Sequence, residues 1–277
     1  TGNTASERAV DADSVTTWQS LTLTVDTIRP TIAITDDDGD NSLGVGDSAT
    51  ITFTLSEASP NFAADDLTVS GGTLSNFAGS GASYSATFTP TTDSTTDVVI
   101  SVASGTFTDT AGHANTDGSD TNNSVTLSVD NVRPTIAISN DDPDHSFTAG
   151  ETSTLTFTLS EPSTNFLQSD VSVSGGTLSN WTAHSSTSYS ASFTPSNNST
   201  ADGLISVASG AFSDAAGNTN NDGSDRNNSV RFSVDTAAPA ITVAINDGGD
   251  AVLNAAEAGS VSIAGTTSGA EDGQTVS

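Results

Sequence analysis

The stretch Ile51-Thr52-Phe53-Thr54-Leu55 alternates apolar residues with threonine. A period of two places the apolar side chains on one face of a β-strand, and β-branched and aromatic residues are common in strands. The same alternation occurs in residues 84–88 and in residues 125–129. About seven such runs fit into each stretch of about 100 residues, separated by Gly, Asn, Asp and Ser turns. The pattern predicts an all-β fold made of short strands.

Two tandem copies of one unit make up most of the chain. The segment Arg29-Pro30-Thr31-Ile32-Ala33-Ile34 recurs 104 residues later, and residues 69–76 recur as residues 173–180. Such self-similarity is the signature of a repeat architecture. We therefore divide the chain into residues 1–26 (the end of a preceding repeat), 27–130 and 131–235 (two whole repeats) and 236–277 (the start of a repeat of a different subtype).

The repeats are predicted to be tandem immunoglobulin-like β-sandwiches in an elongated array, because each holds about seven short antiparallel strands. The usual inter-sheet disulfide would be missing, since the chain has no cysteine. Trp181 replaces Phe77 and is interpreted as a core residue. The other predicted core residues are Phe53, Leu55, Phe88, Val102, Phe107 and Leu127 in the first repeat and Phe157, Leu159, Phe193, Val207 and Phe212 in the second.

The composition is strongly acidic. The 277 residues include 34 Asp and Glu but only 5 Lys and Arg, so the net charge is −29. Such a surface repels phosphate backbones and anionic lipid headgroups, and no apolar run reaches the roughly 20 residues of a membrane span. We therefore expect no nucleic-acid partner and no membrane insertion. The missing cysteine excludes a thiol nucleophile and a cysteine zinc site.

The carboxylates gather between the predicted strands. If the strands reverse direction alternately, the second and sixth connections share the pole at which the chain enters the repeat. This topology would bring Glu57, Asp66 and Asp109 next to Asp26, which precedes the first repeat. The same reasoning applies to the second repeat, and the acids of the first connection would lie at the opposite pole, near the next linker. The predicted ligands are Asp26, Asp36, Asp38, Asp40, Glu57, Asp66, Asp109, Asp130, Asp142, Asp144, Glu161, Asp170, Asp214 and Asp235.

Calcium is the expected cofactor at these clusters, as several ions mainly at domain junctions. Crowded carboxylates repel one another, and Ca²⁺ takes 6 to 8 oxygen ligands at about 2.3–2.6 Å. His113, His145 and His184 have no repeated histidine counterpart, which argues against a transition metal. The alternative is that the acids are solvated turn formers, since Asp and Asn favour turns in any β protein.

Several motifs resemble bacterial immunoglobulin-like repeats. They are the linker Val-Asp-x-x-Arg-Pro, the strand end Thr-Leu-Ser-Glu, and Asp-x-Ala-Gly followed by His or Asn. Such repeats fill the stalks of giant secreted adhesins, including RTX-type biofilm adhesins exported by type I secretion. Residues 245–276 resemble another repeat type of the same adhesins.

The resemblance implies a calcium-rigidified extender at the extracellular surface of a bacterium, which projects a distal binding domain for adhesion or biofilm formation. It implies linker ligands at Asp26, Asp130 and Asp235, joined by Glu57, Asp109, Glu161 and Asp214 from the repeats. Ala238 stands where Arg29 and Arg133 stand in the whole repeats, so the third junction is expected to differ.

Other functions are possible from sequence alone. We expect no enzyme, because no catalytic constellation is visible and every strong motif occurs twice, whereas an active site is usually singular. A module that binds sugar, ice or a protein is a second alternative, although Trp18 and Trp181 lie in different strands. A self-assembling filament subunit is a third, in which neighbouring chains complete the partial repeats by strand addition. We expect a monomer whose partners are the neighbouring repeats of the same chain.

Overall fold

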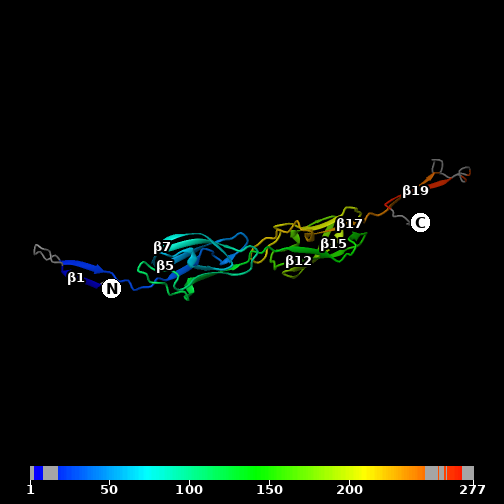
Figure 1. Ribbon diagram of the computed structural model, residues 1–277. Coiled ribbons are helices and arrows are strands. Elements are labelled where there is room, and N and C mark those ends of the chain that lie inside the picture. The colour runs from blue at the N-terminus through cyan, green and yellow to red at the C-terminus, as the bar shows by residue number, and fades with distance from the viewer. Residues whose placement is uncertain (1–2, 9–17, 247–254, 256–258, 260, 270–277) are drawn as a thin grey trace. The chain divides into compact units, whose positions relative to one another are not determined.

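The computed structural model describes residues 3–8, 18–246, 255, 259 and 261–269. The chain divides into two compact units, Thr1–Val132 and Arg133–Ser277, and each contains one whole repeat (Figure 1). The named elements are β-strands and four short 3-10 helices. Among the described residues, no helix is long and apolar enough to cross a membrane. Ahead of the first repeat, β1 (Asn3–Arg8) pairs antiparallel with β2 (Trp18–Leu23).

The first repeat consists of seven strands and two 3-10 helices. They are β3 (Ile32–Asp36), β4 (Ser42–Leu43), β5 (Ala49–Ser59), η1 (Ala64–Asp66), β6 (Leu67–Val69), β7 (Gly72–Pro90), β8 (Val98–Val102), η2 (Thr121–Asn123) and β9 (Ser124–Val129). One sheet has the order β3-β5-β7 and the other the order β4-β9-β8-β6.

The second repeat has the same architecture. Its elements are β10 (Ile136–Asn140), β11 (Ser146–Phe147), β12 (Ser153–Leu159), η3 (Gln168–Asp170), β13 (Val171–Ser174), β14 (Gly176–Ser185), β15 (Ser188–Pro195), β16 (Gly203–Val207), η4 (Arg226–Asn228) and β17 (Ser229–Val234). Its sheets have the orders β10-β12-β15-β14 and β11-β17-β16-β13, and β14 with β15 corresponds to the single long strand β7. The two-sheet arrangement confirms the predicted sandwich.

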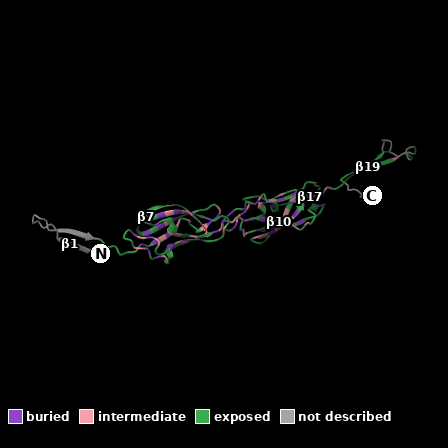
Figure 2. Ribbon diagram, viewed as in Figure 1, coloured by how far each residue is buried: buried purple, intermediate pink, exposed green. Residues whose placement is uncertain are grey.

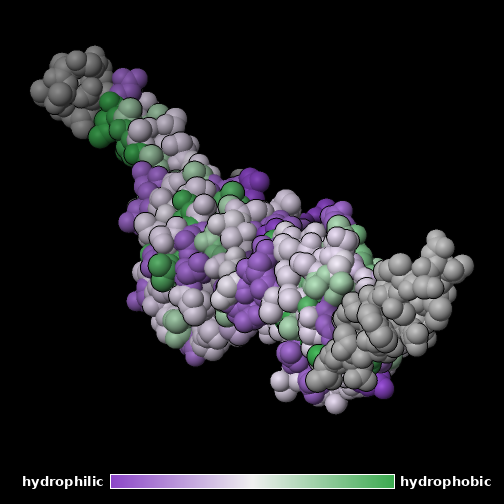
Figure 3. Space-filling model, turned by 90° about the vertical axis from the view of Figure 1, so that its left-hand side faces the viewer, coloured by the Kyte–Doolittle hydropathy of each residue, from purple (hydrophilic) through white to green (hydrophobic). Residues whose placement is uncertain are grey.

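The hydrophobic core of each repeat lies between its two sheets (Figure 2). All eleven residues that the sequence predicted for the cores are buried. Nine of them lie on strands that turn one face inward, while Phe107 and Phe212 lie in the loops after β8 and β16. Trp181 is partly buried with its ring centroid 5.3 Å from that of Phe157 and 5.5 Å from that of Phe166, which confirms it as a core residue. The face of the molecule in Figure 3 is mostly hydrophilic or neutral.

The prediction that the strands reverse alternately is wrong at the first step. β4 pairs in parallel with β9, and β11 pairs in parallel with β17, so the chain keeps its direction between β3 and β4 and between β10 and β11. It passes from an edge of one sheet to an edge of the other. The residues predicted at the far pole, Asp36, Asp38, Asp40, Asp142 and Asp144, therefore belong to this crossover between sheets, and the chain reverses later, in residues 44–48.

The last described part of the chain is a two-stranded ribbon. β18 (Ala240–Asn246) pairs antiparallel with β19 (Ser262–Ser268), and Ile241, Val243 and Ile263 on it are more than half exposed. In the segment that resembles another repeat type, residues 247–254, 256–258, 260 and 270–276 lie outside the described residues.

Candidate metal centre

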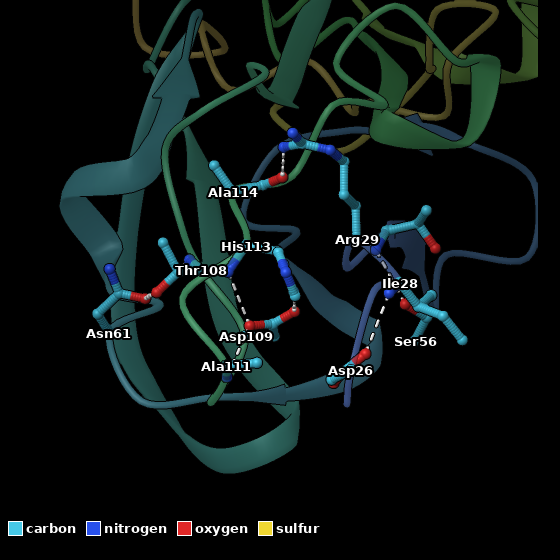
Figure 4. A network of polar contacts seen from close by, with 11 residues as sticks. Asp26, Ile28, Arg29, Ser56, Asn61, Thr108, Asp109, Ala111, His113 and Ala114 are labelled. Carbon is cyan, nitrogen blue, oxygen red and sulfur yellow. Dashed lines mark hydrogen bonds and ion pairs between the residues drawn. The ribbon is translucent and has the colours of Figure 1, made fainter. Parts of the chain in front are cut away.

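At one end of the first repeat, three segments meet. They are the linker before β3, the end of β5 and the loop between β8 and β9. Asp26, Asp109 and His113 offer ligand atoms that all lie within 4.8 Å of one another (Figure 4). β5 and β9 run in opposite directions, so the loop after β5 and the loop before β9 share this end. We call this end the N-terminal pole.

Asp109 is the buried centre of the cluster, with 2% of its surface exposed. Its Oδ1 accepts the backbone N–H groups of Ala111 at 2.8 Å and His113 at 2.9 Å. The His113 ring lies 3.0 Å from Asp109 Oδ2, and Nδ1 carries the proton because an ionised carboxylate can only accept. Burial tends to raise the pKa of Asp109, but the hydrogen bonds from His113 and Ala111 outweigh it and hold this pKa below its usual value. Asp109 is therefore held as an anion.

The second repeat builds the same arrangement with a different residue. Asp214 is buried, its Oδ1 accepts the backbone N–H of Asn218 at 2.9 Å, and its Oδ2 accepts the Asn218 side-chain N–H at 3.0 Å. A carboxylate oxygen of Glu161 lies within 4.8 Å of one of Asp214. The counterpart of His113 is thus Asn218, which donates to the same carboxylate oxygen. From the sequence, His113 was given no role at the site because the second repeat has no matching histidine. The motif Asp-x-Ala-Gly is followed by His in the first repeat and by Asn in the second, and this was the available signal.

Glu57 stands at the end of β5 and is half-buried. Its Oε1 atom is buried and has no hydrogen-bond partner among the described residues. Burial raises the pKa of Glu57, the charges of Asp26 and Asp109 raise it further, and His113 partly opposes them. The structure therefore brings Asp26, Glu57 and Asp109 together, as the sequence predicted, while their role as ligands stays a prediction.

Two further predicted ligands are placed differently. Asp66 and Asp170 cap the 3-10 helices, since their Oδ2 atoms accept the N–H groups of Ala63 at 2.9 Å and Leu167 at 2.8 Å. Among the described residues, Asp66 is not part of the cluster around Asp109. Asp130 and Asp235 directly follow β9 and β17, and their backbone N–H groups donate to the carbonyls of Leu43 at 3.1 Å and Phe147 at 2.9 Å.

Further polar residues hold the loop that carries Asp109 in place. The Arg29 guanidinium donates to the carbonyl of Ala114 at 3.0 Å (Figure 4), and Arg133 donates to the carbonyl of Thr219 at 2.8 Å in the second repeat. Buried Asp117 accepts the N–H of Ile32 at 2.7 Å, which ties the same loop to the start of β3. Asp117, which is not among the predicted ligands, thus anchors the first strand.

The stability of the calcium-free protein is expected to pass through a maximum on the acid side of neutrality. Burial raises the pKa values of Glu57, Asp38 and Asp142, so in the folded state these groups take up protons at higher pH than in the unfolded chain. Stability should therefore rise as the pH falls from 7 through their raised pKa values. Asp109 and Asp141 have lowered pKa values, so stability should fall again below about pH 4, where the unfolded carboxylates protonate. Thermal unfolding by circular dichroism in a chelator checks this profile, and a steady loss from pH 7 downward would contradict it.

Residues 26–127 and 130–232 each match the family described as the bacterial Ig-like domain. The chain belongs to this family. Its two bacterial Ig-like domains coincide with the two sandwiches. No curated protein matches the chain. Among solved structures, it is similar to FdeC, an Escherichia coli adhesin, at 16% identity and a TM-score of 0.41, over 80% of this chain and 70% of that one. It is also similar to invasin, a bacterial integrin-binding protein, at 15% identity and a TM-score of 0.42, over 83% of this chain and 46% of that one.

Proposed function

We propose that this chain is a calcium-rigidified extender segment of a large bacterial surface adhesin of the RTX type. In this role it is a structural spacer, not a catalyst, and it holds a distal binding domain away from the cell. The observation that carries the proposal is the cluster at the N-terminal pole of the first repeat. There Asp26 from the linker meets Asp109 from a loop of the repeat, and the buried Glu57 Oε1 has no partner among the described residues.

The donor set fits a hard divalent cation. Asp26, Glu57 and Asp109 supply carboxylate oxygens, which calcium prefers, and His113 holds one Asp109 oxygen in place. A buried carboxylate oxygen without a donor is costly unless a cation pairs with it. Because one ligand comes from the linker and the others from the repeat, a bound ion would restrict the linker against the repeat. When calcium is removed, repulsion among the same carboxylates would let the linker move relative to the repeat.

The sequence extends the proposal to the second repeat. Asp130 precedes that repeat as Asp26 precedes the first, and Glu161 and Asp214 correspond to Glu57 and Asp109. We propose that these three residues form the equivalent site. Asp235 is followed by Ala238 in place of the arginine, so the next linker would lack the side chain that reaches the loop carbonyl in both whole repeats.

An extracellular location supplies the ion. In millimolar calcium, a site whose dissociation constant lies 100-fold below the free concentration stabilises the folded state by about 2.7 kcal/mol. The absence of cysteine and lysine also suits this proposal, because the chain then has no disulfide to stiffen it and no lysine ammonium group to offset the acidic charge.

Small-angle scattering of the chain in calcium and in chelator tests the proposal. We expect a larger maximum dimension and a higher melting temperature in calcium, because the ion opposes bending at the linkers. The double variant Glu57→Gln, Glu161→Gln should lose most of both responses. The double variant Asp93→Asn, Asp225→Asn removes two exposed carboxylates elsewhere and serves as the control. If the maximum dimension and the melting temperature of the unmodified chain are the same in calcium and in chelator, the proposal is contradicted.

A further inference from the structure

At the end of both whole repeats, the residue after the linker aspartate is held by the repeat that the chain is leaving. After Asp130 this residue is Asn131, which is buried, with 7% of its surface exposed. Its Oδ1 atom accepts the N–H of Ser94 at 2.7 Å, and its Nδ2 atom donates to the carbonyl of Thr91 at 2.8 Å. Its own N–H donates to the carbonyl of Ser94 at 3.1 Å. These bonds hold the start of the linker on the loop between β7 and β8.

The second repeat makes the same contacts with a different side chain. Thr236 follows Asp235 and is 8% exposed. Its Oγ1 atom accepts the N–H of Ser199 at 2.9 Å and donates to the carbonyl of Ser196 at 2.7 Å, and its N–H donates to the carbonyl of Ser199 at 2.9 Å. An amide in one repeat and a hydroxyl in the other thus supply the same acceptor and the same donor to equivalent loops. The two copies keep the pattern of bonds and not the residue, which indicates that the contact itself matters.

The following repeat holds the other end of the linker. The Arg133 guanidinium donates to the carbonyl of Thr219 at 2.8 Å and to its Oγ1 atom at 3.3 Å. Pro134 fixes its own φ and disfavours the helical region for the residue before it, so the Arg133 backbone has little freedom. The strand that follows is tied to its repeat at Ile136, whose N–H donates to Asp222 Oδ2 at 2.7 Å. From Arg133 onward, the chain is therefore held by the second repeat.

A single residue, Val132, lies between these two held segments. The boundary between the two compact units falls directly after it. Because the peptide bond is planar, each residue contributes only two soft backbone dihedrals, φ and ψ. A hinge of one residue therefore allows far fewer orientations than a linker in which every residue is free.

We propose that bending between the two repeats is confined to Val132, because Asn131 fixes one side of the linker and Arg133 fixes the other. Asn131 is a positioning residue in this hinge, and Thr236 has the same part where the chain leaves the second repeat. The hydrogen bonds that hold the linker need no metal ion. The hinge therefore goes beyond the proposed function and also exists in the calcium-free chain.

The spread of distances between one spin label on each repeat tests this inference. The chain has no cysteine, so the variant Thr126→Cys, Ser172→Cys carries labels at two exposed strand positions only. Double electron–electron resonance in chelator should give a narrow distance distribution for this labelled chain. Adding Asn131→Leu removes the side-chain hydrogen bonds at similar size and should broaden the distribution. Adding Asn131→Thr instead should keep it narrow, because threonine makes the same bonds after Asp235.

Two further variants of the labelled chain complete the test. Arg133→Ala releases the linker from the second repeat without touching a core, and it should broaden the distribution as well. Thr135→Ala changes an exposed residue just after the linker, and it should leave the distribution unchanged. The hinge assignment is overturned if Asn131→Thr broadens the distribution as much as Asn131→Leu does. It is also overturned if Arg133→Ala has no more effect than Thr135→Ala.

Added calcium separates this hinge from the proposed function. If calcium changes none of the distributions but Asn131→Leu still broadens the one in chelator, the extender proposal fails and the hinge assignment stands. If calcium narrows the distribution of the labelled chain but Asn131→Leu has no effect in chelator, the hinge assignment fails and the extender proposal stands.

Discussion

Replacing Phe193 by alanine is expected to lower the free energy of unfolding of the second repeat by about 4 kcal/mol. The Phe193 side chain is fully buried, its ring stacks on Phe232 at 5.5 Å between centroids, and the Phe147 ring lies 5.7 Å away. Two glycines make room for the ring. A Cβ atom at Gly176 would come within 2.6 Å of it, and one at Gly203 within 2.7 Å. Alanine would leave a cavity that none of these neighbours can fill, since the sheets hold their backbones.

Chemical denaturation followed by the fluorescence of Trp181 measures this loss, because that side chain packs on the core of the second repeat. A Trp18→Phe background removes the signal of the other tryptophan. The matched control is Leu204→Ala on the same repeat, where 43% of the leucine is exposed, and its effect should stay within about 0.5 kcal/mol. A loss below about 1 kcal/mol for Phe193→Ala would mean that the core repacks around the missing ring.

Replacing Asn220 by alanine is expected to cost about 3 kcal/mol, although asparagine contributes little apolar surface. Its side chain is 1% exposed, and Oδ1 accepts the N–H groups of Ala211 at 2.9 Å and Phe212 at 3.2 Å. Nδ2 donates to the carbonyl of Ala208 at 2.9 Å and to Asp222 Oδ1 at 3.1 Å. Alanine leaves all of these groups without that partner. Asp222 in turn accepts the N–H of Ile136 at 2.7 Å, so the start of β10 is weakened as well.

The same denaturation experiment measures the effect, with Asn221→Ala as its control, because Asn221 is exposed. The loop that Asn220 holds also carries Asp214, so Asn220→Ala should also weaken calcium binding at the proposed pole site. Equal stability of the Asn220→Ala and Asn221→Ala variants would contradict the assignment of Asn220 as the centre of this loop.

The strands and the cores could be predicted because the alternation of apolar and polar side chains is visible directly in the sequence. Ile51, Phe53 and Leu55 are buried and Thr54 between them is exposed, as the opening stretch indicated. The proximity of Glu57 to Asp109 could also be predicted from the sequence, since it depends only on how many times the chain reverses direction before each of these residues. The match of each repeat to the bacterial Ig-like family agrees with this interpretation of the two repeats.

The crossover could not be predicted in the same way. β4 is only two residues long, Ser42–Leu43, and a pattern of period two cannot be recognised in two residues. Nor does alternation say whether the next strand runs parallel or antiparallel. Asn115, whose Oδ1 accepts the N–H groups of Gly105 at 2.9 Å and Thr106 at 3.0 Å, is the counterpart of Asn220 in the first repeat. Both asparagines were missed for a chemical reason, because asparagine before Asp and Gly looks like a turn former. The asparagine-centred hydrogen bonds appear only when the loop is folded.

The parallel pairing of the short strands β4 and β11 with the last strand of each repeat has a mechanical consequence. In the first repeat, Ser128 donates its N–H to the carbonyl of Asn41 at 2.9 Å, and Asp130 donates to that of Leu43 at 3.1 Å. The second repeat has the same two bonds, from Ser233 to His145 and from Asp235 to Phe147, each at 2.9 Å. A pull on the two ends of a repeat drags β4 and β9 past each other along their length, so these bonds are sheared side by side and must break together. The hydrogen bonds between these strands therefore resist the extension of each repeat when its two ends are pulled apart.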